Sequence, residues 1–499
     1  MTLTLGERRW SPALVLLVLA IVALASRSAA FGDPVNHVDD EFYLLVGKVM
    51  LQGGWPYVDI WDRKPVGLFA IYAAIAGVSG AYAVQGVQLV AGLCALATAY
   101  VVQRIGRRLS SDWGGLLAGV AYLVCLPMFG GQTGQSPIFY NLLIAGAALL
   151  FVQSLETGEQ RAVTRRALLA MLWCGLAMTV KQISFIEGGF IGAAFLWRFH
   201  RLGLGLPAIA WRAAAMILLA LAPTLACLLV YVAAGHGEAF VFANFISIFR
   251  KHPVGGLALE RGLVVLVRAL LPVLLIALWG LWVRRRAQGW TDLNLFIAGW
   301  IAAAVAGYLF VPYFFDHYAL PLMVPLSISA ATLYARPRGW WIAAAIALLS
   351  TATGGMVAFE KHAKRIEAAR ALTAVIDREL RGGCLYLVSG RPYFYDATPT
   401  CRMSRFVFPD HLNDNAERDG IGIDQLTEVR RIFANEPTVV VTDVNEDWRR
   451  TPSVKAFVDG ELARHYRPVF KLPGRTPRNL VSLVIWSRVD EAGKTAPAR

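Results

Sequence analysis

Long apolar runs separated by short polar stretches fill the first 358 residues of the chain. A helix needs about 20 apolar residues to cross the hydrocarbon core of a bilayer, and about 17 suffice. Eleven runs reach or approach this length: residues 11–29, 82–103, 113–129, 137–153, 167–180, 183–199, 213–234, 262–283, 293–311, 319–335 and 340–358. The pattern predicts a polytopic α-helical membrane protein with about eleven transmembrane helices, and it excludes a soluble globular protein.

Arginine residues mark every second connection between these runs: Arg8/Arg9, Arg104/Arg107/Arg108, Arg161/Arg165/Arg166, Arg198/Arg201, Arg284 to Arg286, and Arg336/Arg338. Cytoplasmic loops carry an excess of Lys and Arg, so we expect a cytoplasmic N-terminus. The segment 66–79 is apolar but short, and counting it as a span would place every later cluster outside. We therefore expect it to form an interfacial or re-entrant helix. The first run also resembles a cleaved signal peptide, an alternative that leaves the remaining topology unchanged.

The composition changes after Phe359 to an ordinary mixture of charged and apolar residues. With eleven spans this part lies outside the cytoplasm, so we predict two domains, a membrane module over 1–358 with a first outer loop at 32–80, and an extracytoplasmic domain over 359–499. In the second domain we expect an opening helix at 360–381 that ends at Gly382-Gly383. Four β-type runs (384–388, 438–442, 468–472 and 480–486) alternate with two helical stretches (423–434 and 453–465). This order predicts a small α/β fold.

Charge and cysteine content fit a membrane protein. The chain has 57% hydrophobic and only 16% charged residues, and most of the basic residues behind its net charge of +14 flank the apolar runs. We therefore expect membrane lipids as partners and no nucleic acid. Cys384 and Cys401 are the only cysteines outside the spans. In an oxidising compartment we expect them to form a disulfide, with two separate buried thiols as the alternative.

The first outer loop holds the densest group of polar residues. Asp39, Asp40 and Glu41 follow one another, and adjacent carboxylates that are partly buried repel each other, which raises the pKa of one of them toward the range of a general base. For three acids taken alone, a solvated loop or a helix N-terminus is the better explanation.

Basic and aromatic residues predicted on the same face of the membrane complement these acids. Lys64-Pro65 enters the short helix, where a lysine either contacts a lipid phosphate or extends to the interface. The others are Lys181, Arg250, Lys251, His317 and Tyr318. Arg250 and Lys251 lie within the stretch GEAFVFANFISIFRKHP, which predicts another interfacial helix. Cations facing acids are what a phosphate leaving group and a base require.

Two segments of the first loop resemble a known family. DDEFY at 39–43 followed by GGWPYVDIWDRKP at 53–65 is similar to the first-loop signature of GT-C glycosyltransferases, in the branch of dolichyl-phosphate-mannose protein mannosyltransferases and bacterial aminoarabinose transferases. HYALPL at 317–322 with Pro325, and CLYLVSGRPYFYDATPT at 384–400, resemble later parts of that family. Two departures are Val66, where the family has a second proline, and the loop GGQTGQSP, which lacks an expected acid.

The resemblance implies an inverting membrane glycosyltransferase that takes a sugar from a polyprenyl-phosphate donor on the outer face and passes it to a glycan, lipid or protein acceptor. It implies Asp40 as the base or acceptor-orienting residue with Glu41 beside it, and Lys64 near the lipid phosphate. Tyr43, Tyr57 and Asp62 belong to the same signature and are expected near the pocket. We expect no cofactor, because no metal-binding spacing is evident, although a divalent metal is not excluded.

A transporter or lipid flippase is the main alternative, and a non-enzymatic assembly or receptor protein is a second. A transporter predicts ionisable residues near mid-membrane and repeat symmetry, whereas here the ionisable residues concentrate at the outer face. The Ala/Arg-rich composition indicates a bacterium with GC-rich DNA. The expected location is therefore the inner membrane, with the C-terminal domain in the periplasm, and an endoplasmic-reticulum membrane is the minor alternative.

Overall fold

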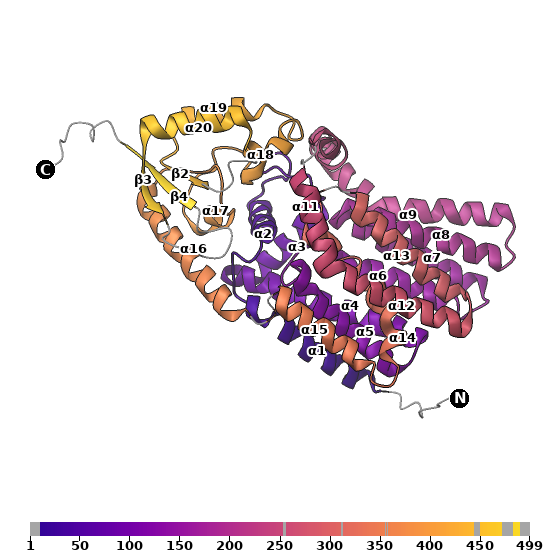
Figure 1. Ribbon diagram of the computed structural model, residues 1–499. Coiled ribbons are helices and arrows are strands. Elements are labelled where there is room, and N and C mark those ends of the chain that lie inside the picture. The colour runs from indigo at the N-terminus through magenta and orange to yellow at the C-terminus, as the bar shows by residue number, and fades with distance from the viewer. Residues whose placement is uncertain are drawn as a thin grey trace.

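Apolar helices build most of the chain, as the computed structural model shows (Figure 1). The structure describes residues 10–252, 256–310, 313–354, 356, 358–443, 450–471 and 483–489. The helices of the first part are α1 (Pro12–Arg27), α2 (Val38–Leu51), α3 (Val66–Ser79), α4 (Ala83–Leu109), α5 (Asp112–Cys125), α6 (Ser136–Ser154), α7 (Gln160–Val180), α8 (Phe185–Arg201), α9 (Leu206–Ala233), α10 (Gly237–Val241), α11 (Gly256–Val265), α12 (Leu271–Gln288), α13 (Asp292–Phe310), α14 (Met323–Tyr334) and α15 (Trp340–Gly354).

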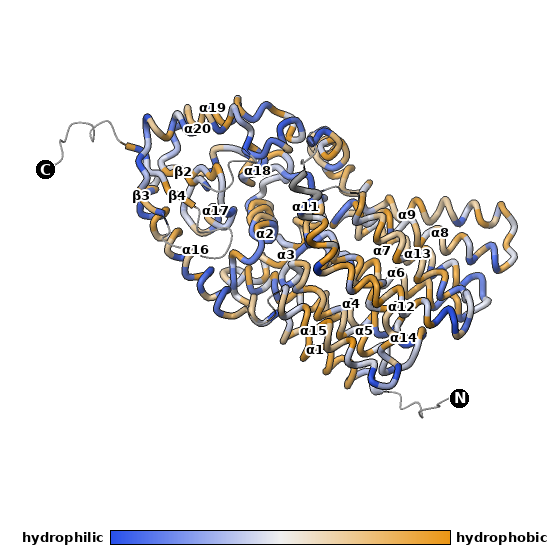
Figure 2. The backbone as a smooth tube through the Cα atoms, viewed as in Figure 1, coloured by the Kyte–Doolittle hydropathy of each residue, from blue (hydrophilic) through white to orange (hydrophobic). Residues whose placement is uncertain are grey.

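Eight helical stretches within the described residues are long and apolar enough to cross a membrane. They are Pro12–Ala30, Val66–Leu109, Asp112–Phe129, Ser136–Ser154, Gln160–Val180, Leu206–Ala233, Gly262–Gln288 and Asp292–Phe310. The three other predicted spans correspond to the shorter helices α8, α14 and α15. In α9 only 6% of the apolar window is buried, so its side chains face outward along a hydrophobic surface (Figure 2). The predicted multi-pass helical membrane protein is confirmed.

Helix α3 covers the predicted short segment 66–79. It begins after Pro65 and ends at Gly80, whose φ of 54° turns the chain before α4 starts at Ala83. It packs closely on α2, because a Cβ atom at Gly47 would lie 2.7 Å from the Ala73 nitrogen. Whether α3 lies in the interface, as the Arg pattern predicts, stays a prediction. The stretch after Gly237 is helical but irregular, with one α, one π and one 3₁₀ segment between Gly237 and Arg250.

The C-terminal part has the predicted α/β fold. Helix α16 (Phe359–Leu380) ends at Arg381 and Gly382, which both have positive φ. Strands β1 (Leu385–Leu387), β2 (Val439–Asp443), β3 (Tyr466–Lys471) and β4 (Leu483–Arg488) form one sheet in the order β1-β2-β4-β3, in which the β1–β2 pair is parallel and the other pairs are antiparallel. The further helices are α17 (Tyr393–Ala397), α18 (Pro409–Asn413), α19 (Gln425–Ala434) and α20 (Pro452–His465). Residue 472 and residues 480–482 of the predicted strands lie outside the described residues.

Side chains that alternate along the strands give this sheet two buried faces. Leu385, Leu387 and Val439 pack with residues of α16, whereas Tyr386 and Val440 pack with residues of α19 and α20. A disulfide joins Cys384 at the start of β1 to Cys401, the pair expected from its position outside the spans.

Helix α2 of the first loop lies directly against the C-terminal part (Figure 1). Lys48 Nζ is 2.7 Å from Asp396 Oδ1, and Glu41 pairs with Arg391. Further back in the loop, Asp33 Oδ2 is 2.8 Å from His362 Nδ1. These contacts fix the first loop between the membrane helices and the C-terminal sheet, and the cavity described below lies at this junction.

Candidate functional site

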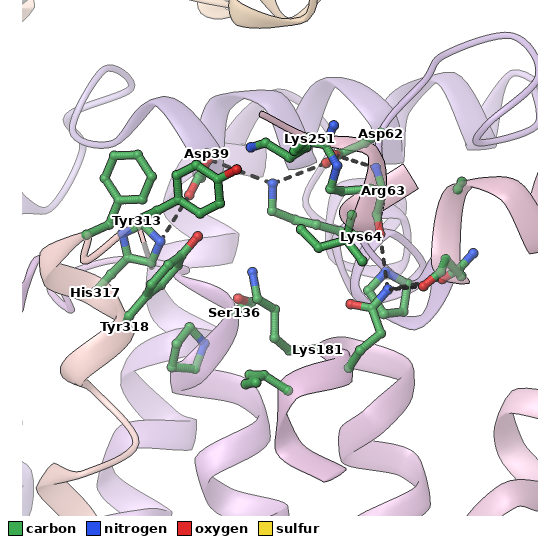
Figure 3. Close-up of a pocket in the computed structure, with 18 of the residues that line it drawn as sticks. Asp39, Asp62, Arg63, Lys64, Ser136, Lys181, Lys251, Tyr313, His317 and Tyr318 are labelled. Atoms are coloured by element: carbon green, nitrogen blue, oxygen red, sulfur yellow. Dashed lines mark hydrogen bonds and ion pairs between the residues drawn. The ribbon is translucent and has the colours of Figure 1, made fainter. Parts of the chain in front are cut away.

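A large cavity opens where the first loop, the membrane helices and the C-terminal part meet. Its volume is about 1480 Å³. Lys64, Lys181, Lys251 and His317 line it together with Asp39 and Asp62 (Figure 3). Apolar side chains line another part of it: Leu221, Leu225, Val264 and Phe310 from the membrane helices, and Phe245 and Ile248 from the irregular helix after Gly237. The cavity therefore joins a charged region to an apolar groove.

The three consecutive acids point to three different places because they occupy the first turn of α2. Successive helical residues are rotated by about 100°. His37 caps this helix, since its Nδ1 accepts a hydrogen bond of 3.2 Å from the Asp39 amide. Of the three acids only Asp39 lines the large cavity.

Asp39 lies among positive and ionisable groups. Its carboxylate oxygens are 4.0 Å from Lys64 Nζ, 3.8 Å from His317 Nε2 and 4.0 Å from His37 Nδ1. Burial raises the pKa of Asp39, but Lys64 and the two histidines outweigh it and hold the pKa well below its usual range. An ionised carboxylate thus faces the cavity.

Asp40 faces a loop between α5 and α6. Its Oδ2 accepts hydrogen bonds from Thr133 Oγ1 and, at 3.0 Å, from the Gly134 amide. Arg27 fixes the same loop, because its Nη1 donates to the Gly131 carbonyl at 2.8 Å. Asp40 lines a separate void of about 30 Å³, and burial raises the pKa of its carboxyl. Asp40 therefore accepts hydrogen bonds from the loop GGQTGQSP and lies outside the large cavity.

Glu41 faces the C-terminal part. Its carboxylate pairs with Arg391 and accepts a hydrogen bond of 3.3 Å from the Tyr393 amide. The side chain is 1% exposed and joins α2 to α17, so it connects the two parts of the chain and does not line the cavity.

Lys64 lies at the centre of the charged region. Its Nζ is 3.3 Å from Asp62 Oδ2 and 5.1 Å from the centre of the Tyr43 ring. Burial lowers the pKa of Lys64, but Asp62 and Asp39 outweigh it and raise the pKa. Tyr57 adopts φ 73°, and its hydroxyl donates to the Lys64 carbonyl at 2.8 Å. Tyr43 and Tyr57 therefore contact Lys64 on the side away from the cavity, and neither lines the cavity. Asp62 lines it.

Lys181 follows the last residue of α7 and points into the same region (Figure 3). Its Nζ lies 5.6 Å from the centre of the Tyr318 ring. Within the described residues it makes no ion pair of 4.0 Å or less, unlike Lys64 and Lys251. Burial, with the charge of Lys64 added, lowers the pKa of Lys181 to about 8.

Among the other predicted phosphate ligands, Lys251, His317 and Tyr318 line the cavity but Arg250 does not. Arg250 is exposed, and its guanidinium lies 5.6 Å from the Phe242 ring. Sequence reasoning did not select several ionisable lining residues, among them His37, Arg63, His411 and Glu417. Arg63 stands beside Lys64 in the motif, which is a usable signal. Nothing in the sequence indicates that His411 and Glu417 fold back onto the first loop.

Three of these residues form a candidate metal centre. His37, Asp39 and His317 each offer one ligand atom within 4.8 Å of the other two, a donor set that zinc binds. However, the lone pair of His37 Nδ1 already accepts hydrogen bonds from the Asp39 amide and from Gln135 Nε2 at 2.5 Å. Lys64 also lies beside Asp39. The residues as arranged do not fit a metal unless Gln135 moves away.

The sequence matches no protein-family model and no curated protein sequence. The structure is similar to that of ArnT from Cupriavidus metallidurans bound to undecaprenyl phosphate, with a TM-score of 0.63 and 12% identity over 97% of this chain and 99% of that chain. It is also similar to the Archaeoglobus fulgidus oligosaccharyltransferase in the apo form, with a TM-score of 0.52 and 11% identity over 88% and 70% of the two chains. The complex of the archaeal enzyme with Zn and sulfate gives a TM-score of 0.50 and 11% identity over 93% and 73%. These neighbours are GT-C glycosyltransferases, and the chain has their GT-C fold, as its sequence resemblance predicts.

Proposed function

We propose that this protein is an inverting glycosyltransferase that moves a sugar from a polyprenyl-phosphate donor to a hydroxyl-bearing acceptor. One observation carries the proposal: a single cavity combines the ionised carboxylate of Asp39, three lysines (Lys64, Lys181 and Lys251) and an apolar groove that opens among the membrane helices. The groups of a lipid-linked sugar phosphate complement this arrangement, because its phosphate is anionic and suits the lysines and its lipid chain is apolar and suits the groove. The GT-C fold and the undecaprenyl phosphate bound to ArnT support the proposal.

In the proposed reaction the acceptor oxygen attacks the anomeric carbon as the bond to the phosphate oxygen breaks. The acceptor hydroxyl proton passes to a carboxylate, and the lipid phosphate leaves with the bonding electrons. Lys64 and Lys181 stabilise the negative charge of the leaving phosphate. A base contributes typically 10² to 10⁴-fold to such a step.

We assign the carboxylate to Asp39. Its support is access, because Asp39 lines the cavity within 4.0 Å of Lys64. The family resemblance favours Asp40 instead, and the raised pKa of Asp40 also suits a base. However, the hydroxyl oxygen of the acceptor must approach a carboxylate oxygen of the base to within about 3 Å. Asp40 does not line the cavity, because its carboxylate is bound to the loop at Thr133. The proposed role of Asp40 is to hold that loop.

We propose that transfer does not depend on a resident metal. The support is the hydrogen bonding of His37 Nδ1 and the position of Lys64 beside Asp39, where a divalent ion would be repelled. We further propose an inner-membrane location with the cavity and the domain over 359–499 in the periplasm. The contacts of α2 with Asp396 and Arg391 support placing the first loop and this domain on one side.

The decisive experiment is transfer by the purified protein in lipid nanodiscs, without an ion gradient. Undecaprenyl-phosphate sugars serve as donors, and release of undecaprenyl phosphate is measured with and without EDTA. We expect release that requires a donor and an acceptor and persists in EDTA. In sealed proteoliposomes, transport of the donor without cleavage would instead identify a flippase. Complete loss of transfer in EDTA would contradict the proposal on metal.

A further inference from the structure

A carboxylate from the C-terminal part neutralises two cations of the cavity. Glu417 lies in a 3₁₀ turn, Asn415–Glu417, between α18 and α19. It pairs with both terminal nitrogens of Arg63, with Nη1 at 3.0 Å from Oε1, and its Oε1 is 2.6 Å from Lys251 Nζ. All three side chains line the cavity.

The geometry of this cluster is that of an anion site. The fork of an arginine binds two oxygens of a carboxylate or of a phosphate in the same way. Arg63 is oriented by Ser247, whose hydroxyl oxygen accepts from Nε at 3.2 Å, and Lys251 Nζ lies 4.2 Å from the centre of the Tyr313 ring. Arg63 and Lys251 are near one another on the cavity wall (Figure 3). The cations are therefore prearranged, and Glu417 occupies the place of an anionic group.

We propose that Glu417 is an internal substitute for a substrate phosphate, which displaces it from Arg63 and Lys251 and so couples phosphate binding to movement of the C-terminal segment 414–420. This inference rests on the proposed function and extends it to a positioning residue that sets the affinity of the cavity for phosphate. Glu417 does not contact the reacting atoms.

The attachment of this segment is suited to such an exchange. Besides the Glu417 pairs, the Ala416 carbonyl accepts from the His252 amide at 2.9 Å, and the Gly420 carbonyl accepts from Ser247 Oγ at 2.5 Å. Gly420 lies close to Lys251, since a Cβ atom there would be 3.0 Å from Lys251 Cγ. His252 also pairs with Asp419, and Gln425 Nε2 donates to the Asp414 carbonyl at 3.0 Å. Displacement of Glu417 therefore removes its contacts with Arg63 and Lys251, while the contacts of Asp414 at the start of the segment can act as a hinge.

Charge explains why the exchange is favourable. With Glu417 ionised, Arg63, Lys251 and Glu417 together carry one net positive charge. Buried cations without a counter-ion are unfavourable, so the site favours binding of a further negative charge. Burial raises the pKa of Glu417, but Arg63 and Lys251 outweigh it and hold the pKa well below its usual range. A phosphate competes with Glu417 for the same donors, so loss of the carboxylate should strengthen phosphate binding. If Glu417 instead only held Arg63 and Lys251 in position, its loss would weaken phosphate binding.

The test compares full-length wild-type protein, Glu417→Gln and Glu436→Gln in nanodiscs. Glu436 is a matched control, because it pairs with Arg488 at 2.5 Å on the exposed surface of the same domain. Binding of undecaprenyl phosphate and of inorganic phosphate is measured for each protein. Amide hydrogen exchange of residues 252 and 416–420 is followed with and without each probe.

We expect Glu417→Gln to bind phosphate at least ~5-fold more tightly, the effect of an interaction of about 1 kcal/mol, while Glu436→Gln behaves as wild type. In the wild-type protein, exchange at 416–420 should rise when either probe binds. Equal or weaker binding by Glu417→Gln, or exchange that falls or stays constant on binding, overturns the proposal.

Lys251→Gln keeps the test decisive if Glu417→Gln does not fold. This variant should weaken phosphate binding and abolish the exchange response, and an unchanged response overturns the proposal. If inorganic phosphate binds but undecaprenyl phosphate does not, and Glu417→Gln binds inorganic phosphate more tightly than wild type, the proposed role of Glu417 is supported. The proposal of a polyprenyl-phosphate donor is then contradicted. If none of the proteins binds either probe, both proposals fail.

Discussion

The carboxylate of Asp39 faces the ammonium of Lys64 across the charged end of the cavity, with Oδ1 and Nζ 4.0 Å apart. These residues are 25 positions apart in the sequence, and α2 and the turn at residues 57–59 bring them together. The pair links the acid to the cation that the proposed reaction requires. The pair also distinguishes Asp39 from its sequence neighbours, because Asp40 binds the Gly134 amide and Glu41 binds Arg391.

The first prediction concerns these three acids. Asp39→Asn keeps the shape of the side chain but removes its charge and its affinity for a proton. We expect turnover to fall by at least ~10²-fold with donor binding nearly intact. Lys64→Ala should weaken donor binding as well as turnover, because the site loses a charge opposite the phosphate. Transfer rates and donor affinity in nanodiscs distinguish the two effects.

Asp40→Asn and Glu41→Gln are the matched variants. Each lies in the same turn but is bound outside the cavity, to Gly134 and Arg391 respectively. We expect both to lower thermal stability more than turnover. A folded Asp40→Asn protein without activity, next to an active Asp39→Asn protein, would restore the assignment that the family resemblance makes.

A second prediction follows from the pKa of Lys181. An ammonium binds phosphate only while protonated, and burial lowers the pKa of this lysine to about 8. We therefore expect kcat/KM to fall as pH rises through about 8. Bound phosphate raises the pKa of a nearby lysine, so the fall in kcat should occur at higher pH.

Lys181→Arg tests the cause, because arginine stays charged at these pH values. The decline near pH 8 should disappear from the pH profile of this variant. Lys48→Arg is the control, since Lys48 pairs with Asp396 outside the cavity. A decline that persists in Lys181→Arg would mean that another group titrates.

Much of the fold follows from local patterns in the sequence. The apolar runs predict the membrane helices because any helix in a bilayer must satisfy its own backbone. The alternation of short strands and helices after Phe359 predicts the sheet, whose four strands, as far as the structure describes them, begin and end within three residues of the expected ranges. Helix α8 and the irregular helix after Gly237 also appear where apolar spacing places them.

The site was less accessible to such reasoning. The predicted topology places Lys64, Lys181 and His317 on one face of the membrane, and the structure places all three on the cavity wall. The directions of Asp39, Asp40 and Glu41 depend on where α2 begins, and that is fixed by the cap at His37. Glu417 reaches Arg63 across 354 positions of sequence, and no local pattern encodes such a contact.

The third prediction concerns the disulfide between Cys384 and Cys401, which closes a loop with a sequence separation of 17. In the chain-entropy model a loop of this size contributes about 3 kcal/mol to the free energy of unfolding. Cys384→Ser combined with Cys401→Ser should therefore unfold the C-terminal part at lower denaturant concentration. Mass spectrometry of the unreduced protein should show the two cysteines linked. Free alkylatable thiols at both positions would contradict the prediction.

The last prediction concerns the side of the membrane on which each loop lies. Arg63 of the first loop pairs with Glu417 of the C-terminal part, so the number of crossings between them must be even. The predicted spans α4 to α9 and α12 to α15 make ten crossings if α3 does not cross. Single cysteines at three exposed positions test this count: Gln52→Cys, Glu159→Cys and Ser453→Cys. An impermeant maleimide applied from the periplasmic side should label positions 52 and 453 and leave 159 unlabelled until the membrane is opened. Labelling of 52 and 159 together, without 453, would mean that α3 crosses the membrane and that the contact between Arg63 and Glu417 does not form.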